Sequence, residues 1–288
     1  MSAAVHQVVW VGDRLVDPAT ASVHWSDHGL TVGDGVFETL KVLDGTPFAL
    51  TRHLDRLARS AAGLGLALPD AALVLEAVGA VADGIAAPGG RLRITVTGGP
   101  GPMGSSRGTD GPTLLVAGQA VDLAAPPFFG PTAVATVPFT RNATAATVGL
   151  KTTSYADNVV ALARAEAAGA TEALLANTDG ELCEGTGSNV FVVVDGVLCT
   201  PPLSSGCLGG ITRELVLEAL DAAGTPAVVR DLPMSVLRTA DEVFLTSSTR
   251  DVQAVRSVDG RELPGCPGPR TRAAADAFAR AYADRLDP

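Results

Sequence analysis

Lysine is nearly missing from this chain. Among 288 residues only two lysines occur, Lys41 and Lys151, so arginine carries almost all of the positive charge. Arginine stays protonated and cannot act as an amine nucleophile, whereas a desolvated lysine loses its proton and can form an imine with a carbonyl group. Schiff-base chemistry is therefore restricted to two positions. Lys41 falls in a strand pattern typical of a half-exposed residue, which leaves Lys151 as the stronger candidate.

Basic charge, paired cysteines and long apolar runs are also scarce. The net charge of −10 argues against binding of nucleic acid or of an anionic membrane, because both need a basic face. No signal-peptide pattern and no membrane-spanning run occur, so we expect a cytoplasmic protein. The four cysteines lack C-x-x-C spacing, so we expect no metal site and reduced, buried thiols at Cys183, Cys199, Cys207 and Cys266.

The apolar share of 47% is large enough for a substantial core in one or two domains. Strand and helix patterns are mixed, without the regular alternation of a doubly wound fold, which predicts an α+β protein. Pro126, Pro127 and Pro131 interrupt regular structure. We therefore predict a small N-terminal domain over residues 1–120, an inter-domain linker over 121–131 and a larger C-terminal domain over 132–288.

Turn residues and periodicity predict the individual elements. Two strands flank the turn at Gly12, and Asp44-Gly45 is the turn of a hairpin over residues 35–50. Thr51 is the expected N-cap of the next helix. That helix should bury Leu54, Leu57, Ala58 and Ala61. We also expect a helix after Pro69, strands over 91–99, 112–118, 172–177 and 242–248, a hairpin over 188–200, and helices over 155–169, 212–224 and 268–286.

Five places in the sequence have side chains suited to chemistry. Lys151 lies in an uncharged stretch, where desolvation would depress its pKa. Glu184 precedes small residues that allow close backbone approach. Gly209-Gly210 lead into a helix start at Ile211 and Thr212, where free N–H groups favour an anion. The remaining two are a hydroxyl cluster that follows a strand (Ser247, Ser248 and Thr249) and Arg52 at the start of a helix.

Each of these places also has a plain structural interpretation: a solvated lysine, a turn glutamate, ordinary capping by Thr212, a polar loop, and an Arg52–Asp55 pair. Together, however, they supply an amine nucleophile, a carboxylate, an anion cradle, hydroxyls and an arginine. A pyridoxal phosphate (PLP) site requires a Schiff-base lysine, a partner for the pyridinium nitrogen and a phosphate cup. The combination therefore predicts a PLP site.

The order of "LK", "EGTGSNVF", "GGITRE" and "TSST" resembles the class IV aminotransferases, the fold type IV PLP enzymes, over about residues 23–263. This family includes branched-chain aminotransferases, D-amino-acid transaminases, (R)-amine transaminases and aminodeoxychorismate lyases. The resemblance implies a two-domain α+β fold and a homodimer with shared active sites.

The resemblance also implies a role for several residues. Lys151 would form the Schiff base with PLP, and Glu184 would keep the pyridine nitrogen protonated. Tyr155 would hydrogen-bond the ring hydroxyl of the cofactor, and Phe37 would line the substrate pocket. The phosphate would be bound by Arg52, by backbone groups of Ile211 and Thr212, and by Ser248 and Thr249.

The substrate is less well defined by the sequence. The "P-R-x-H" loop of D-amino-acid transaminases is missing from "TGGPGPMGSSRG", so Arg93, Arg107 and Arg250 are alternative candidates for holding a substrate carboxylate. Each of them also fits a structural role. We expect a transaminase acting on D-amino acids and 2-oxo acids, with (R)-amines as an option.

Several other functions remain as alternatives. Within the family these are an aminodeoxychorismate lyase releasing pyruvate and 4-aminobenzoate, and a branched-chain L-amino-acid aminotransferase. From other classes they are a cofactor-binding protein without turnover and an unrelated acidic α+β binding module.

Overall fold

The computed structural model describes residues 6–125 and 130–288, and these residues form two compact units. The first unit contains the chain up to residue 123 together with the short segments 150–155 and 286–288. The second contains residues 124–149 and 156–285. The division thus gives two pieces of the predicted 132–288 domain to the first unit. Residues 126–129 of the predicted linker lie outside the described residues.

The first unit is built on a six-stranded antiparallel sheet in the order β2-β1-β6-β5-β3-β4. The predicted turns at Gly12 and at Asp44-Gly45 connect neighbouring strands, and all three residues have the positive φ that such turns require. The strands are β1 (Gln7–Val11), β2 (Arg14–Val16), β3 (Gly35–Leu43), β4 (Thr46–Pro47), β5 (Gly89–Thr97) and β6 (Thr113–Ala120).

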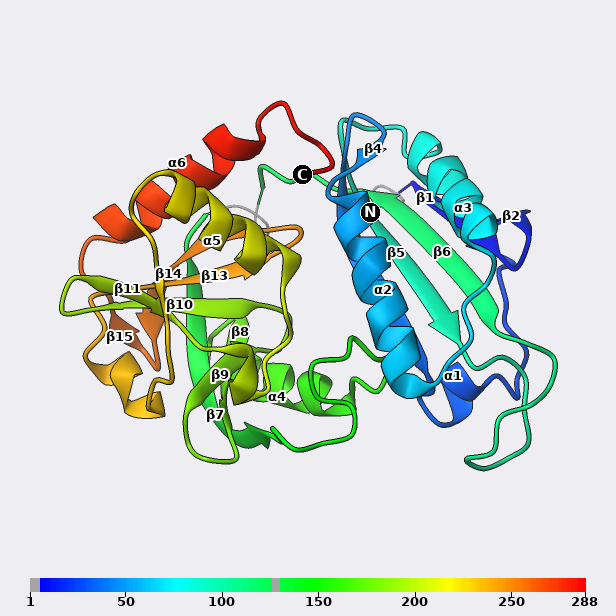
Figure 1. Ribbon diagram of the computed structural model, residues 1–288, viewed down its shortest axis with the longest axis horizontal. Coiled ribbons are helices and arrows are strands. Elements are labelled where there is room, and N and C mark those ends of the chain that lie inside the picture. Colours follow the sequence, from blue (N-terminus) through cyan, green and yellow to red (C-terminus); the bar gives the residue numbers. More distant parts are fainter. Residues whose placement is uncertain (1–5, 126–129) are drawn as a thin grey trace. The chain divides into compact units, whose positions relative to one another are not determined.

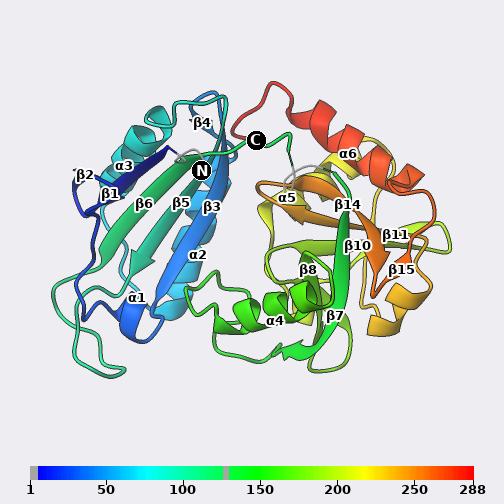
Figure 2. The same cartoon turned by 180° about the vertical axis from the view of Figure 1, so that it is seen from behind.

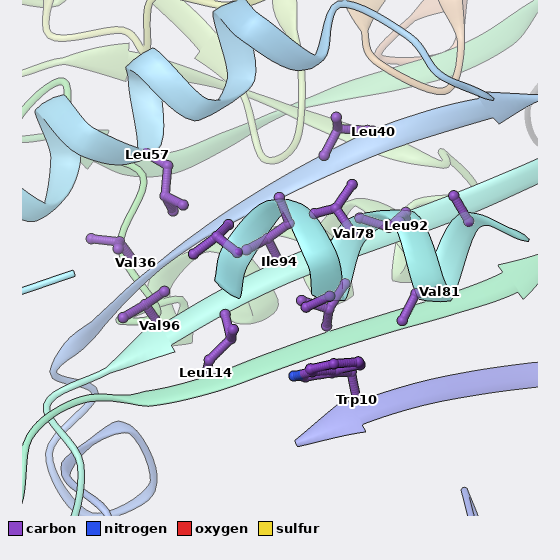
Figure 3. Packing of buried hydrophobic residues seen from close by; sticks show 14 of the residues in the cluster. Trp10, Val36, Leu40, Leu57, Val78, Val81, Leu92, Ile94, Val96 and Leu114 are labelled. Atoms are coloured by element: carbon purple, nitrogen blue, oxygen red, sulfur yellow. The ribbon is translucent and has the colours of Figure 1, made fainter. Parts of the chain in front are cut away.

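Three helices accompany this sheet: α1 (His28–Thr31), α2 (Leu50–Leu64) and α3 (Ala71–Asp83). Apolar side chains from α2, α3 and alternate positions of the strands form one buried cluster, as Figure 3 shows for Leu57, Val78 and Ile94. Because strand side chains alternate between faces, the residues between these positions point to the opposite face of the sheet. Phe37 and Arg93 belong to that opposite set, which matters for the site described below.

The start and the buried face of α2 differ from the prediction. The helix begins at Leu50 after Ala49, which has a left-handed conformation, so Thr51 is not the N-cap. Instead, the Asp287 carboxylate accepts hydrogen bonds from the Thr51 amide (2.9 Å) and hydroxyl (2.6 Å). Ala58 is exposed. The polar residues His53, Arg56 and Ser60 lie on the buried side with Leu57 and Ala61. His53 and Arg56 are partners of a buried glutamate of β3, and Ser60 accepts from the main chain of Lys151.

The second unit is built on a nine-stranded mixed sheet in the order β12-β11-β10-β13-β14-β7-β8-β9, with β15 paired to β14. The β7 strand is parallel to both of its neighbours and was not predicted from the sequence. The strands are β7 (Thr132–Arg141), β8 (Glu172–Asn177), β9 (Leu182–Gly185), β10 (Asn189–Val194), β11 (Val197–Thr200), β12 (Val228–Val229), β13 (Glu242–Ser247), β14 (Asp251–Val258) and β15 (Arg261–Glu262).

The helices predicted over residues 155–169, 212–224 and 268–286 are present and pack on this sheet. The α4 helix (Ala156–Ala167) packs on β7 and β8 (Figure 2). Its buried contacts with these strands are Ala133, Ala135, Val137, Ala173 and Leu175. The α5 helix (Ile211–Ala222) and the α6 helix (Pro269–Tyr282) lie side by side and both contact β13 (Figure 1). Two short 3-10 helices, η1 (Leu203–Ser205) and η2 (Met234–Arg238), complete the unit.

Three of the four cysteines are free and buried, as predicted, and Cys266 is half-buried. Burial raises the pKa of Cys183 to about 12, which keeps this thiol protonated and unreactive. Within residues 6–125 and 130–288, no helix is long and apolar enough to cross a membrane. The same residues contain no cluster of three or more histidine, cysteine, aspartate or glutamate side chains that could hold a metal ion.

Candidate active site

The main chain of Lys151 is fixed within the first unit by β3 and α2. Phe37 N donates to the Lys151 carbonyl (3.0 Å), and Thr153 N donates to the Gly35 carbonyl (2.8 Å). The Lys151 amide itself donates to Ser60 Oγ of α2 (3.1 Å). A side chain at Gly35 would collide with Val96 O and with Thr153, so glycine permits this close approach. An isolated antiparallel bridge between Val36 and Thr152 thus places the lysine beside β3.

Three of the residues predicted from the sequence meet around the ring of a fourth, Phe37. Lys151 Nζ lies 4.4 Å from the ring centroid, and Arg93 Cζ lies 3.7 Å from it. Tyr155 packs edge-on against the same ring with centroids 5.3 Å apart. Arg93 Nε donates to Thr95 Oγ1 (3.2 Å), and no carboxylate of the described residues pairs with this partly buried guanidinium. The group combines an amine, a phenol and a cation that is open to an anionic ligand.

A buried charge cluster lies on the helix-facing side of β3 and was missed from the sequence. Glu38 Oε1 accepts from Arg56 Nε (2.8 Å), and Glu38 Oε2 accepts from Arg56 Nη2 and from His53 Nδ1 (2.6 Å each). Burial opposes ionisation of Glu38, but the Arg56 charge and these hydrogen bonds outweigh it and lower the pKa of Glu38 to about 2. Burial also lowers the pKa of His53, and the nearby charges of Arg56 and Lys151 act in the same direction.

The predicted phosphate ligand Arg52 lies elsewhere on α2. Its Nε donates to the Pro288 carbonyl (2.8 Å), whereas Arg56, one helical turn further along, is buried against Glu38. The spacing in the sequence could have indicated this buried polar face of α2, because His53, Arg56 and Ser60 recur at helical intervals with Leu57 and Ala61. Whether Arg52 binds a phosphate remains a prediction.

Arg107, a second candidate for the substrate carboxylate, is engaged within the first unit. Its Nε and Nη2 form a bidentate pair with Asp34 (2.6 Å each), and its other contacts are the carbonyls of Leu64 and Gly65 at the end of α2. This guanidinium fixes the loop that follows β5 to the helix. Its contact with a substrate carboxylate stays a prediction.

In the second unit, Glu184 is a buried residue of β9 held from two sides. Arg141 Nε lies 3.0 Å from Glu184 Oε1, and the Leu208 amide donates to Glu184 Oε2 (2.9 Å). The Leu208 carbonyl in turn accepts from Asn189 Nδ2 (2.8 Å). Arg141, at the end of β7, was also missed, because nothing in the sequence links the end of one strand to a glutamate 43 residues later. The carboxylate has a defined position that a cationic ligand group could use.

The start of α5 has the properties of an anion cradle. Its N-cap is Gly210, and no side chain caps the first helical amides, those of Ile211 and Thr212. A Cβ at Gly210 would overlap Asn189 Oδ1, so the chain approaches β10 more closely than any other residue allows. Asn189 is paired with Thr246 of β13, which places the helix start beside the end of that strand.

Hydroxyl side chains lie at and just beyond this strand end. The buried Thr246 Oγ1 has no hydrogen-bond partner among the described residues, and the half-buried Ser248 and Thr249 follow it. A buried hydroxyl without a partner, beside uncapped helical amides, indicates a place for a polar anionic group. The second unit therefore offers groups that fit the phosphate and the ring nitrogen of PLP.

The comparisons with known proteins agree with this chemistry. Residues 35–258 match the model of the amino-transferase class IV family. The chain is 33% identical to a putative branched-chain-amino-acid aminotransferase of Methanocaldococcus jannaschii over 266 residues, which cover 88% of this chain and 89% of that protein. It is 32% identical to a D-alanine aminotransferase of Bacillus licheniformis, with 90% of this chain and 91% of that protein covered.

A solved structure gives the same result. A hypothetical aminotransferase from Mycobacterium tuberculosis, in its PLP-bound form, superimposes with a TM-score of 0.85 at 29% identity, and the match covers 96% of this chain and all of that one. The predicted α+β fold of this enzyme class is thereby confirmed. From the matched residues, the sequence identities and the fold, we conclude that this chain belongs to the class IV aminotransferases and is a PLP-dependent enzyme.

Proposed function

We propose that this enzyme transfers an amino group between an amino acid that carries an α-carboxylate and a 2-oxo acid, with D-amino acids as the preferred donors. The observation that carries this proposal is the arrangement around Phe37. The ring contacts both the Lys151 amine and the Arg93 guanidinium, and Arg93 has no carboxylate partner in the described part of the chain. A substrate whose carboxylate pairs with Arg93 would bring its amino group close to Lys151.

The roles of the remaining residues follow from their chemistry. PLP, when bound, supplies an electron-withdrawing ring that stabilises negative charge at the substrate α-carbon. Lys151 would hold the cofactor covalently, and its Nζ would serve as the base that accepts the proton of the substrate α-carbon and as the acid that donates it back to the substrate–cofactor system. A positioned base of this kind contributes about 10²–10⁴-fold in rate. The Phe37 ring excludes water from one side of the amine, because its side chain is buried.

Glu184 is the proposed partner of the cofactor's ring nitrogen. Its carboxylate is held by Arg141 and by the Leu208 amide, which leaves little freedom for it to rotate away. The Ile211 and Thr212 amides and the hydroxyls of Ser248 and Thr249 are the proposed phosphate ligands. Tyr155 is proposed to hydrogen-bond the ring hydroxyl.

Two observations bear on the substrate. Relatives named D-alanine aminotransferase, at 30–32% identity, support D-amino acids. The relative at 33% identity is named a putative branched-chain-amino-acid aminotransferase, which makes branched-chain L-amino acids the second candidate. An aminodeoxychorismate lyase would use the same lysine and remains an outcome of the test. We also propose a homodimer, which sedimentation would detect at twice the chain mass of 29.1 kDa.

A half-reaction panel tests the proposed function. The PLP-loaded enzyme is mixed separately with D-alanine, D-glutamate, L-leucine, (R)-phenylethylamine and aminodeoxychorismate, and its absorbance spectrum is followed. We expect conversion to the pyridoxamine form with D-alanine and D-glutamate. Conversion by L-leucine alone would favour the branched-chain candidate, and release of 4-aminobenzoate would identify a lyase. Spectral inertness towards every carboxylate-bearing amine would contradict the proposal.

A further inference from the structure

The buried carboxylate of Glu172 is the centre of a hydrogen-bond network in the second unit. Its Oε1 accepts from the Thr186 amide (2.9 Å) and from the Thr186 hydroxyl. Its Oε2 accepts from Ser188 Oγ (3.1 Å) and from Arg250 Nη2 (2.8 Å). Only 3% of Glu172 is exposed, so its charge depends on these four donors.

Glu172 fixes the turn that directly follows Glu184. This turn, Gly185–Ser188, is closed by a hydrogen bond from Gly185 N to Ser188 O (2.8 Å). It packs so tightly on Glu172 that a side chain at Gly185 would overlap Ser188 Oγ and approach Glu172 Cδ to 3.2 Å. A change at Glu172 therefore moves the residues bonded to the main chain of Glu184.

A second route leads from the same turn to the Glu184 side chain. The Thr186 carbonyl accepts from Asn158 Nδ2, and Asn158 Oδ1 accepts from Arg141 Nη1 (3.0 Å). Arg141 Nε lies 3.0 Å from Glu184 Oε1. The guanidinium that orients Glu184 is thus itself oriented by the turn that Glu172 holds.

Arg250 completes the network on its outer side. Its Nε donates to Ser247 Oγ (3.0 Å), its Nη1 donates to Gln253 Oε1 (3.4 Å), and its Nη2 pairs with Glu172. Three side chains of one unit therefore hold this guanidinium. Arg250 also directly follows Ser248 and Thr249, so it ties the hydroxyl segment to the turn after Glu184.

We propose that Arg250 and Glu172 form a positioning pair that sets the orientation of the Glu184 carboxylate through Asn158 and Arg141. This inference rests on the proposed role of Glu184 as the partner of the cofactor's ring nitrogen. It differs from the role expected from the sequence, in which Arg250 holds the substrate carboxylate. The two roles predict different kinetics, because a positioning residue acts on the cofactor before any substrate binds.

The test compares Arg250→Gln with Arg250→Lys and Asn158→Ser in PLP-loaded enzyme. We expect Arg250→Gln and Asn158→Ser to shift the visible absorbance band in the same direction and to lower kcat by about 2- to 30-fold, with KM for the amino acid unchanged. Arg250→Lys keeps the charge towards Glu172 and should recover part of both effects. Asn158→Ser leaves the Arg250–Glu172 pair intact, so it reports on the network even where Arg250→Gln folds poorly.

Arg261→Gln is the matched control. Arg261 holds two main-chain carbonyls of the same unit, those of Leu237 (2.8 Å) and Ala240, outside this network. Its replacement should leave the spectrum and kcat unchanged.

Three results would overturn the positioning role. A raised KM with an unaltered spectrum and kcat in Arg250→Gln would indicate that Arg250 contacts the substrate carboxylate instead. An Arg250→Gln variant identical to wild type in every readout would show that the Arg250–Glu172 pair does not position Glu184. A wild-type protein that forms no visible band with PLP would overturn the proposed function and the pair together, whereas the first two results leave the proposed function intact.

Discussion

Lys151 and Arg93 contact the same aromatic ring, that of Phe37, although 58 residues separate them in the chain. The β-sheet register explains the encounter. Phe37 lies opposite Thr95, two residues from Arg93 on the same face of β5, and Phe37 N donates to the Lys151 carbonyl. The nucleophile and the candidate carboxylate ligand are therefore positioned by one strand, so substitutions can separate their roles.

Replacing Arg93 by lysine should weaken binding of carboxylate substrates. Lysine keeps the charge but loses the planar fork that pairs with a carboxylate. We expect KM for the amino acid to rise about 10-fold, since a charge-assisted hydrogen bond contributes about 1.5 kcal/mol. Arg91→Lys is the control, because Arg91 is exposed on the same strand two residues away. Equal effects of the two substitutions in steady-state kinetics would argue against Arg93 as the carboxylate ligand.

The Glu38 cluster should make the protein sensitive to acid. Glu38 has a pKa of about 2 in the folded chain against 4.5 when unfolded, so its contribution is complete above pH 4.5 and is lost as the pH falls towards 2. The pKa of His53 is lowered from 6.5, so the unfolded chain also binds more protons below that pH. The two effects have the same sign, and the free energy of unfolding should fall on acidification from about pH 6.5.

Glu38→Gln tests this origin of the acid sensitivity. We expect it to lower the free energy of unfolding at pH 7 by about 3–5 kcal/mol, because Arg56 is left buried without its carboxylate partner. It should also flatten the pH dependence between 4.5 and 2. Asp55→Asn, on the exposed side of the same helix, should change stability by less than about 0.5 kcal/mol. Urea unfolding at several pH values measures both, and a Glu38→Gln profile parallel to wild type would contradict the assignment.

Gly210→Ala should weaken binding of the cofactor. The added Cβ overlaps Asn189 Oδ1, so the start of α5 must shift, at a cost of about 1–3 kcal/mol in stability. Titration of the apoprotein with PLP should then show a higher Kd. Gly79→Ala is the control, because a Cβ there meets nothing within 4 Å in the middle of α3. It should stabilise the protein by about 0.5–1 kcal/mol. An unchanged Kd in Gly210→Ala would argue against the anion cradle.

The local elements were predictable from the sequence because their signals are local. Turn residues such as Asp44-Gly45 and the apolar spacing of α5 fix elements within a few residues of themselves. The amine nucleophile was also predictable, because only a lysine can supply it and the chain has two lysines.

The parts that escaped prediction depend on distant contacts. The β7 strand is defined by its parallel partners β8 and β14, and Arg141 becomes important only because that strand ends beside Glu184. Likewise, Thr51 fails as an N-cap because Asp287, 236 residues away, supplies the acceptor instead. Pairings across such distances leave no periodicity in the sequence.

The most direct test of the central claim locates the covalent bond between the enzyme and PLP. The loaded enzyme is reduced with borohydride and digested, and the modified lysine is identified by mass spectrometry, with Lys41→Arg as the matched control. We expect the label on Lys151 in both proteins and no label in Lys151→Ala, because Lys41 Nζ lies over the Phe48 ring, 4.3 Å from its centroid, in a side chain that is only 7% exposed. A label on Lys41, or an unlabelled wild-type protein that still transfers amino groups, would contradict the account.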